Sequence, residues 1–253
     1  MMKRFISSVL VLGVCLTPLT VPLMVQPSWA QGQNSQVEKL KQLIEQAQQQ
    51  ERQGQARQAI ETWQQVLAIA RQFKQRGGEA IALTAIGFNY DSISQPQEAL
   101  KYYNQALPIR REVGDRRGEA ATLSNIGGVY HSISQLQEAL KYYNQALPIM
   151  QQVGDRRGEA TTLSNIGLAY NNISQPQEAL KYFNQALPIL RQVGDRRGEA
   201  VTLNNIGLAY NSISQPQEAL KYYNQAFAMA REIGDRTLEA TILDKMKAVN
   251  NRQ

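Results

Sequence analysis

A repeat of 40 residues governs this chain of 253 residues. The segment EALKYYNQALPI and its close variants stand at 98–109, 138–149, 178–189 and 218–229. Residues 115–154 and 155–194 are identical at 31 of 40 positions, and the register holds without a gap from about residue 40 to residue 250. Self-similarity at this spacing is typical of a solenoid, in which each unit buries its apolar face against the next unit.

Each copy contains the patterns of two helices. In the third copy, Gly114 suits the left-handed conformation that ends a helix, and Asp115 suits the cap of the next one. The residues that then follow at the spacing of one helix face are Ala120, Leu123, Ile126, Gly127 and Tyr130. Gly127 and Ala139 are small enough to let the two helices of a copy approach closely, with Tyr130 and Tyr143 expected at the wider ends of the crossing.

The second helix of the third copy is expected to begin with a capping box. Ser134 to Gln137 fit the pattern S-x-x-Q, and the sister copies have a proline in its second half, where no backbone donor is needed: Pro96, Pro176 and Pro216. The apolar face continues through Ala139, Leu140, Tyr143, Ala146, Leu147 and Ile149. Pro148 lies inside this helix, where we expect a bend and not an end, because Ile149 and Val153 keep the apolar spacing.

On these residues the chain resembles the tetratricopeptide repeat family. The residues of the third copy that match the family pattern are Leu123, Ile126, Gly127, Tyr130, Ala139, Tyr143 and Ala146. The resemblance implies an all-α fold, a right-handed α-solenoid of stacked antiparallel helix hairpins. The period of 40 differs from the usual ~34 residues and resembles the long-period repeats of kinesin light chains and of many cyanobacterial proteins, which implies a bacterial protein. The family's late proline is also displaced.

Residues 40–234 are predicted to form five such repeats, at about 40–73, 80–113, 120–153, 160–193 and 200–233. Residues 235–250 begin a further first helix, which we interpret as a capping helix with a short tail at 251–253. Lys247 stands there in place of the close-packed glycine, and no second helix follows that would need the gap.

Residues 1–30 have the pattern of a signal peptide. Lys3 and Arg4 precede an apolar run, two prolines interrupt it, and Ser28-Trp29-Ala30 puts small residues at a cleavage site after Ala30. The prediction is export to the periplasm or the medium, with 31–39 as a short linker and no stable membrane span after cleavage. An uncleaved membrane anchor and a lipoprotein attached at Cys15 are the alternatives.

The residue content argues against an enzyme. His131 is the single histidine, Cys15 the single cysteine, and the latter lies in the predicted signal peptide. No catalytic site, metal site or cofactor is therefore predicted. The net charge of +6, which falls to +4 without residues 1–30, does not argue for nucleic acid as a partner.

Asn125, Asn165 and Asn205 occupy one place in successive first helices. In the resembled family this helix lines the concave groove, and in the kinesin-light-chain type asparagines at this place hold the backbone of an extended peptide. An amide suits that role because it both donates and accepts; the alternative is that these side chains bond to neighbouring first helices. The resemblance also places in the groove Phe88, Gly128, Leu168 and Leu208, and the polar residues His131, Asn171 and Asn211.

Three arginine pairs recur in the first turn of the first helices: Arg116-Arg117, Arg156-Arg157 and Arg196-Arg197. Cations there oppose the helix dipole. They are expected either to reach the preceding helix or acids such as Asp115 and Glu119, or to form a rim for an anionic partner.

The sequence therefore predicts an exported, non-catalytic scaffold that binds a peptide segment or partner protein. The second hypothesis is a structural spacer or a self-associating array without a specific ligand.

Overall fold

The computed structural model describes residues 28–251, with side chains from Val37 onward. Two compact units divide the chain, residues 1–39 and residues 40–253. The predicted signal peptide lies almost entirely outside the described residues, and only its last three residues fall within them. Residues 31–39, expected as a linker, are helical and belong to α1.

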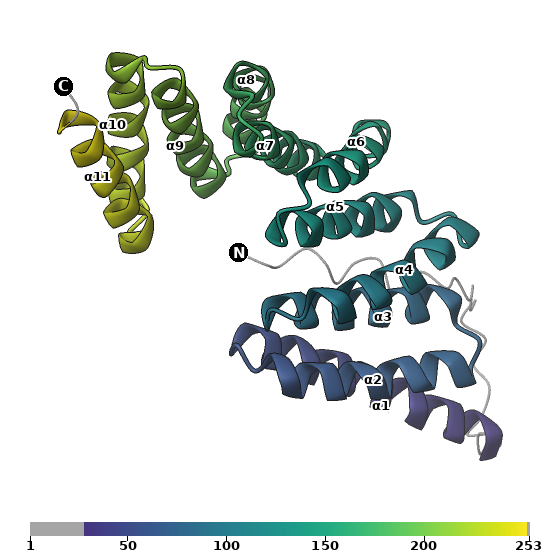
Figure 1. Cartoon of the computed structure of the whole chain (residues 1–253). Helices are drawn as coiled ribbons and strands as arrows, with labels where there is room; N and C mark the ends of the chain where they lie inside the picture. Colours follow the sequence, from purple (N-terminus) through teal and green to yellow (C-terminus); the bar gives the residue numbers. More distant parts are fainter. Residues whose placement is uncertain (1–27, 252–253) are drawn as a thin grey trace. The chain divides into compact units, whose positions relative to one another are not determined.

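The described residues form helices and no strand, which confirms the all-α fold (Figure 1). The helices are α1 (Ser28–Arg52), α2 (Ala56–Gln72), α3 (Arg76–Ser92), α4 (Pro96–Glu112), α5 (Arg116–Ser132), α6 (Leu136–Gln152), α7 (Arg156–Asn172), α8 (Pro176–Gln192), α9 (Arg196–Ser212), α10 (Pro216–Glu232) and α11 (Arg236–Asn250).

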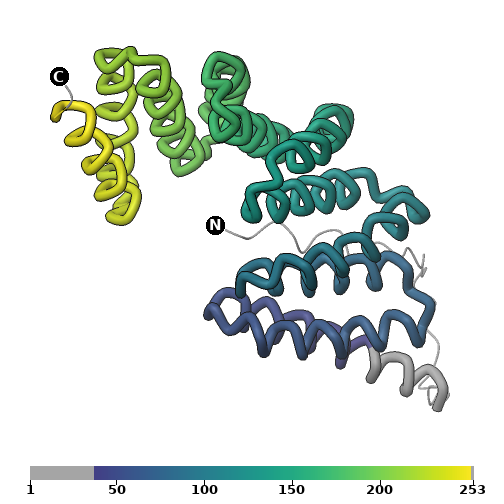
Figure 2. The backbone as a smooth tube through the Cα atoms, viewed as in Figure 1, coloured from purple at the N-terminus to yellow at the C-terminus, as the bar shows by residue number. Residues whose placement is uncertain are grey.

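Within residues 40–253 the helices pack in order along the chain (Figure 2). Each second helix from α4 to α10 contacts the first helix of its own repeat and that of the next one. First helices also contact one another from repeat to repeat, in the pairs α3–α5, α5–α7, α7–α9 and α9–α11. The side chains that α3, α5, α7, α9 and α11 leave exposed or half-buried therefore form one continuous surface, which we call the first-helix face.

The turns between helices are short and all contain one left-handed residue. After the second helices α4, α6, α8 and α10 this residue is glycine, as at Gly114 with φ +69°, which confirms the expectation for that position, whereas after α2 it is Lys74. After the first helices α3, α5, α7 and α9 it is serine, as at Ser134 with φ +60°, whereas after α1 it is Gly54. The amide of Ser134 donates to the His131 carbonyl and that of Gln135 to the Tyr130 carbonyl, the two bonds of a Schellman motif.

The predicted capping box at Ser134 is therefore wrong. Gln135 is the N-cap of α6, and its side chain makes no capping bond. Only three residues separate α5 from α6, and Ser134 must be left-handed to end α5, so it cannot also cap α6. Asp115 does cap α5, since its carboxylate accepts from the Gly118 amide at 2.8 Å.

The crossing within the repeats that have Gly87, Gly127, Gly167 or Gly207 confirms the close approach at glycine but corrects the role of the tyrosines. A Cβ on Gly127 would lie 2.7 Å from the Tyr143 ring, so Tyr143 covers the glycine itself and does not fill a wider end. Tyr130 instead stacks on Tyr142, with ring centroids 5.4 Å apart. Pro148 lies within an unbroken α6, as expected for a helix that does not end there.

Candidate functional site

The three candidate asparagines lie one to a helix on α5, α7 and α9, and all are half-buried. Among the described residues, the side-chain amides of Asn125 and Asn165 have no hydrogen-bond partner, whereas Asn205 Oδ1 accepts from Asn204 Nδ2 at 3.1 Å. These three asparagines are hereafter the amide row.

Hydroxyl groups, and not the amide row, join α5 to α7 and α7 to α9. Ser124 pairs with Thr162 at 3.1 Å, and Ser164 pairs with Thr202 at the same distance. Each pair links a half-buried serine to a buried threonine on the next first helix. The alternative role for the asparagines was hydrogen bonding between neighbouring first helices. These bonds are made instead by the serines that directly precede Asn125 and Asn165.

A pocket of about 380 Å³ opens on the first-helix face between α7 and α9. Its lining includes Asn165 and Ser164 from α7 and Arg197 and Val201 from α9. The structure therefore brings one amide of the row together with one of the rim arginines, which the sequence had placed at separate sites. A ligand group in this pocket would meet an amide, hydroxyls, an apolar wall and the charged groups of Asp195 and Arg197.

The apolar candidates are unevenly exposed. Phe88 on α3 is 54% exposed, while Leu168 and Leu208 are half-buried on α7 and α9. On α5 the equivalent residue is Gly128, which has no side chain. The atom nearest to a Cβ at this position would be the Tyr143 hydroxyl oxygen at 3.9 Å, so the space above it is unfilled. A ligand side chain thus has room over α5.

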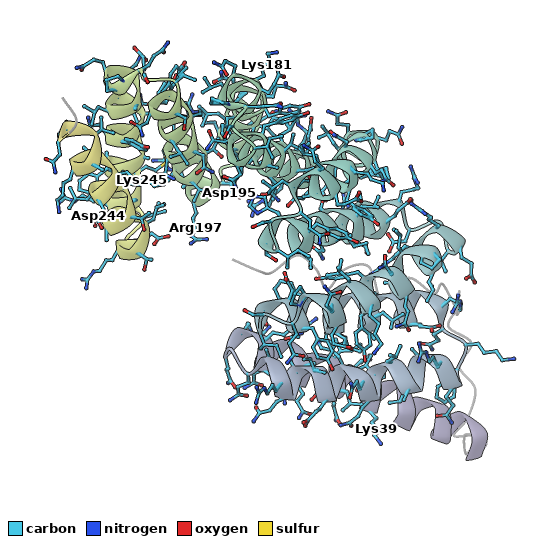
Figure 3. The ribbon with its side chains drawn as sticks, viewed as in Figure 1. Lys39, Lys181, Asp195, Arg197, Asp244 and Lys245 are labelled. Atoms are coloured by element: carbon cyan, nitrogen blue, oxygen red, sulfur yellow. The ribbon has the colours of Figure 1, made fainter. Side chains whose placement is uncertain are left out.

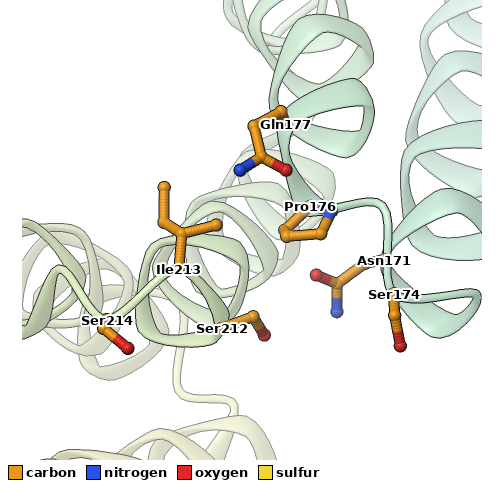
Figure 4. Close-up of a pocket in the computed structure, with 7 residues that line it drawn as sticks. All are labelled: Asn171, Ser174, Pro176, Gln177, Ser212, Ile213 and Ser214. Atoms are coloured by element: carbon orange, nitrogen blue, oxygen red, sulfur yellow. The ribbon is translucent and has the colours of Figure 1, made fainter.

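Asn171 lines a second, polar pocket of about 480 Å³ where the turn after α7 faces the turn after α9 (Figure 4). The other lining residues are Ser174, Pro176, Gln177, Ser212, Ile213 and Ser214. Asn171 Oδ1 is buried and has no partner within the described part of the chain. Asn211, the equivalent residue on α9, is half-buried.

At the equivalent junction one repeat earlier, a hydrogen bond joins the two repeats. Asn172 Nδ2 donates to His131 Nε2 at 3.0 Å, and burial lowers the pKa of His131, which favours the neutral ring that can accept this bond. Ser212 replaces Asn172 in the next repeat, and its shorter side chain makes its bond to the Leu208 carbonyl instead. The Asn171 acceptor therefore receives no hydrogen bond from the following repeat.

The rim arginines all pair with acids. Arg116, Arg156 and Arg196 each contact the glutamate three residues later in the same helix, which is buried in each case. Arg117, Arg157 and Arg197 reach the N-cap aspartate of the following repeat, at 3.5, 3.9 and 2.9 Å. Asp115 pairs with Arg110 and not with Arg117. The rim is thus largely neutralised by its own acids.

Arg110 and Lys245 are two residues of interest that sequence reasoning missed. Arg110 is buried where the sister repeats have Met150 and Leu190, and its Nε has no partner in the described structure. Lys245 lies at the amide-row place on α11, 40 residues after Asn205, and its amine contacts Asn204. The repeat register alone could have found both, since it aligns Lys245 with Asn205, and Arg110 with Met150 and Leu190.

No cluster of three or more residues able to hold a metal ion occurs in residues 28–251. None of the helices described here has both the length and the apolarity to cross a membrane. What the first-helix face offers is hydrogen bonding and apolar contact.

Comparison with solved structures supports this architecture. The chain is similar to BtubC from P. vanneervenii, with 20% identity, a TM-score of 0.69, and coverage of 77% of this chain and 80% of that one. It is also similar to a putative kinesin light chain from Podosopora anserina with nearly identical TPR-like repeats, with 21% identity, a TM-score of 0.63, and coverage of 77% of this chain and 96% of that one. For aspartyl phosphate phosphatase F from Bacillus subtilis the identity is 18%, the TM-score 0.70, and the coverage 78% of this chain and 52% of that one. No curated protein matches the sequence.

The tetratricopeptide repeat family matches four overlapping stretches of the chain, residues 43–112, 95–152, 118–192 and 158–232. The matched stretches include every helix from α2 to α10. Together with the stacked helix pairs and the glycine–aromatic crossing, this match shows that the chain belongs to the tetratricopeptide repeat family.

Proposed function

We propose that this protein is an exported, non-catalytic scaffold that binds a peptide segment of a partner protein on its first-helix face. The observation that carries the proposal is the amide row, in which Asn125 and Asn165 keep both donor and acceptor groups unpaired among the described residues. An extended backbone also repeats its donors and acceptors, so it can match such a row. The resemblance to kinesin-light-chain repeats implies this mode of binding, and a putative kinesin light chain is among the solved structures of similar fold.

The test needs a peptide and a matched asparagine outside the site. Peptides of about 12 residues selected from a display library on the wild-type protein would be titrated by calorimetry. Asn165→Ala should weaken binding about fivefold, since a neutral hydrogen bond contributes about 1 kcal/mol. Asn184→Ala, an exposed asparagine on α8, should leave binding unchanged.

Two outcomes would reject the proposal. If Asn165→Ala binds normally but unfolds at lower urea concentration, the amide is structural. If no peptide binds saturably and the protein sediments as an oligomer, the alternative of a self-associating array is correct. Replacing both Arg156 and Arg157 by alanine tests the rim, because loss of binding in that variant alone would point to an anionic partner.

Export has a separate test. The basic start, the broken apolar run and Ser28-Trp29-Ala30 support cleavage after Ala30. N-terminal sequencing of the protein purified from the extracytoplasmic fraction should begin at Gln31. An intact Met1 on protein recovered from the cytoplasm would refute export, and an intact Met1 in the membrane fraction would indicate the uncleaved anchor.

A further inference from the structure

The repeat pattern is broken at Gly128, on the first-helix face. The equivalent residues of the neighbouring first helices, Phe88 on α3 and Leu168 on α7, have large apolar side chains. A Cβ on Gly128 would lie 3.9 Å from the Tyr143 hydroxyl oxygen, the nearest atom of another helix. The space over Gly128 therefore lies between two helices with apolar side chains at this place, and a tyrosine hydroxyl is at its base.

Asp91 is an acid on α3, which contacts α5. It lies one turn after Phe88 and occupies the place that Asn171 and Asn211 have on α7 and α9. Its carboxylate is half-buried and, among the described residues, forms no ion pair and no hydrogen bond. Burial raises the pKa of Asp91, because removing a carboxylate partly from water without a counter-charge disfavours its charged form.

The charge of Asp91 acts on two tyrosine hydroxyls. Burial and, next, this charge raise the pKa of both Tyr103 on α4 and Tyr143 on α6. Within the described part of the chain, neither hydroxyl has a hydrogen-bond partner, and neither is a fully buried polar atom. Phe183 stands at the equivalent place of α8, so the later repeats lack this combination of an acid and two hydroxyls.

Other aspartates of the array differ from Asp91 because arginines pair with them. The aspartates that cap α7, α9 and α11 each have an arginine of the preceding repeat, at 3.5, 3.9 and 2.9 Å. Asp195 and Arg197 at the start of α9 (Figure 3) also line one pocket together. A basic ligand group would meet an arginine there, whereas none of the described cations pairs with Asp91.

We propose that the space over Gly128 binds a basic side chain of the peptide, with its cation paired to Asp91. This inference rests on the proposed function. The carboxylate would accept a charge-assisted hydrogen bond, and the Tyr143 oxygen is a second acceptor. The Phe88 ring, 54% exposed, offers an apolar surface that also attracts a cation. Lysine and arginine share this chemistry, and substitution in the peptide decides between them.

The first experiment tests the cation site without any peptide. Butylammonium chloride and propylguanidinium chloride would each be titrated into the full protein at constant ionic strength, with sodium chloride as the counter-titration, and followed by NMR. The Asp91 carboxylate carbon and the Gly128 amide should shift saturably, while the carboxylate of Glu61, an exposed acid on α2, should not. An equal response at the two acids would overturn the proposal.

The second experiment identifies the basic residue. Peptides selected on the wild-type protein would be made with each lysine replaced by norleucine and each arginine by citrulline, which removes the charge and keeps most of the shape. Removing the recognised charge, or changing Asp91→Asn, should each weaken binding about tenfold, and the two changes together should cost no more than one. Glu61→Gln is the matched control and should change affinity less than about twofold.

Gly128→Leu tests the space itself. Leucine stands at the equivalent place of α9, Leu208, where the following helix also has a tyrosine, Tyr223. The variant should unfold at no lower urea concentration than the wild type and should lose the preference for the basic peptide over its uncharged analogue. An unchanged preference in the folded variant would reject this space as the site. Asp91→Asn introduces the residue of α7 and α9, so it decides the question even if Gly128→Leu does not fold.

The outcomes separate this proposal from the function on which it rests. If peptides bind through Asn165 but Asp91→Asn binds every one of them normally, the cation site is rejected and the peptide scaffold stands. If the small cations bind at Asp91 and no peptide binds at all, the cation site stands and the peptide scaffold is rejected. Failure of both arms rejects both.

Discussion

Helices α7 and α11 share one sequence register, but among the described residues only α7 is followed by a second helix. In α7, Gly167 lies against the Phe183 ring, and Ile166 beside it is fully buried. At the equivalent places of α11, Lys247 is exposed and Met246 is only half-buried. The requirement for a glycine and a large apolar residue therefore comes from the second helix that covers them, and not from the first helix itself.

The largest expected difference is at the buried apolar place. Ile166→Ala should lower the free energy of unfolding by about 3 kcal/mol, because it leaves a cavity that the surrounding helices cannot fill. Met246→Ala should cost about 1 kcal/mol, since less apolar surface is buried there. Urea unfolding of both variants measures the difference, and equal losses would show that α11 is packed like an internal helix.

The glycine place should give the next largest difference. In Gly167→Leu the new Cβ would lie 2.7 Å from the Phe183 ring, so the variant should lose about 2 kcal/mol through overpacking. Lys247→Leu should change stability by less than about 0.5 kcal/mol, as expected for an exposed position. A large loss in Lys247→Leu would mean that something covers α11 in solution.

The smallest effect concerns how α11 is held to α9. The pKa of Asp235 is lowered by the hydrogen bond from the Leu238 amide and, next, by Arg197. Because the folded-state pKa is depressed, this stabilisation is present above the unfolded pKa of about 3.9 and is lost as pH falls through the folded value. Asp235→Asn keeps an N-cap acceptor but cannot titrate.

Urea midpoints measured from pH 6 down to pH 2.5 test this last prediction. The wild type should lose slightly more stability than Asp235→Asn over that range, with the two curves converging at the acid end. Asp244→Asn, an exposed acid on the same helix, controls for the loss of one carboxylate. Parallel curves for wild type and Asp235→Asn would show that the aspartate does not hold α11 to α9.

The sequence predicts much of this fold because most of its local signals, such as helix caps and helix ends, have a single structural interpretation. Gly114 and Asp115 end one helix and cap the next, and the glycine at 127 accommodates an aromatic ring. Ser134 shows where this fails. A serine three residues before a glutamine fits both a capping box and a left-handed helix end, and only the length of the turn decides between them.

The candidate site is less predictable because its contacts join different repeats. The register places Asn165 on the first-helix face, but it does not indicate that Arg197 lines the same pocket. It likewise gives no sign that Arg117 pairs with Asp155 of the next repeat. Such pairings depend on side-chain reach across a helix interface, which a 40-residue periodicity does not encode.

The bond between His131 and Asn172 distinguishes one junction from others that are otherwise nearly interchangeable. A chain that looped out residues 155–194 could dock α9 on α5 and α6 with almost the same core, since the two copies are identical at 31 of 40 positions. Such misassembly is a characteristic failure of repeat proteins. It would bring Ser212 to His131 in place of Asn172, so the few residues that differ between copies are those by which the folding chain distinguishes its correct neighbour from a wrong one.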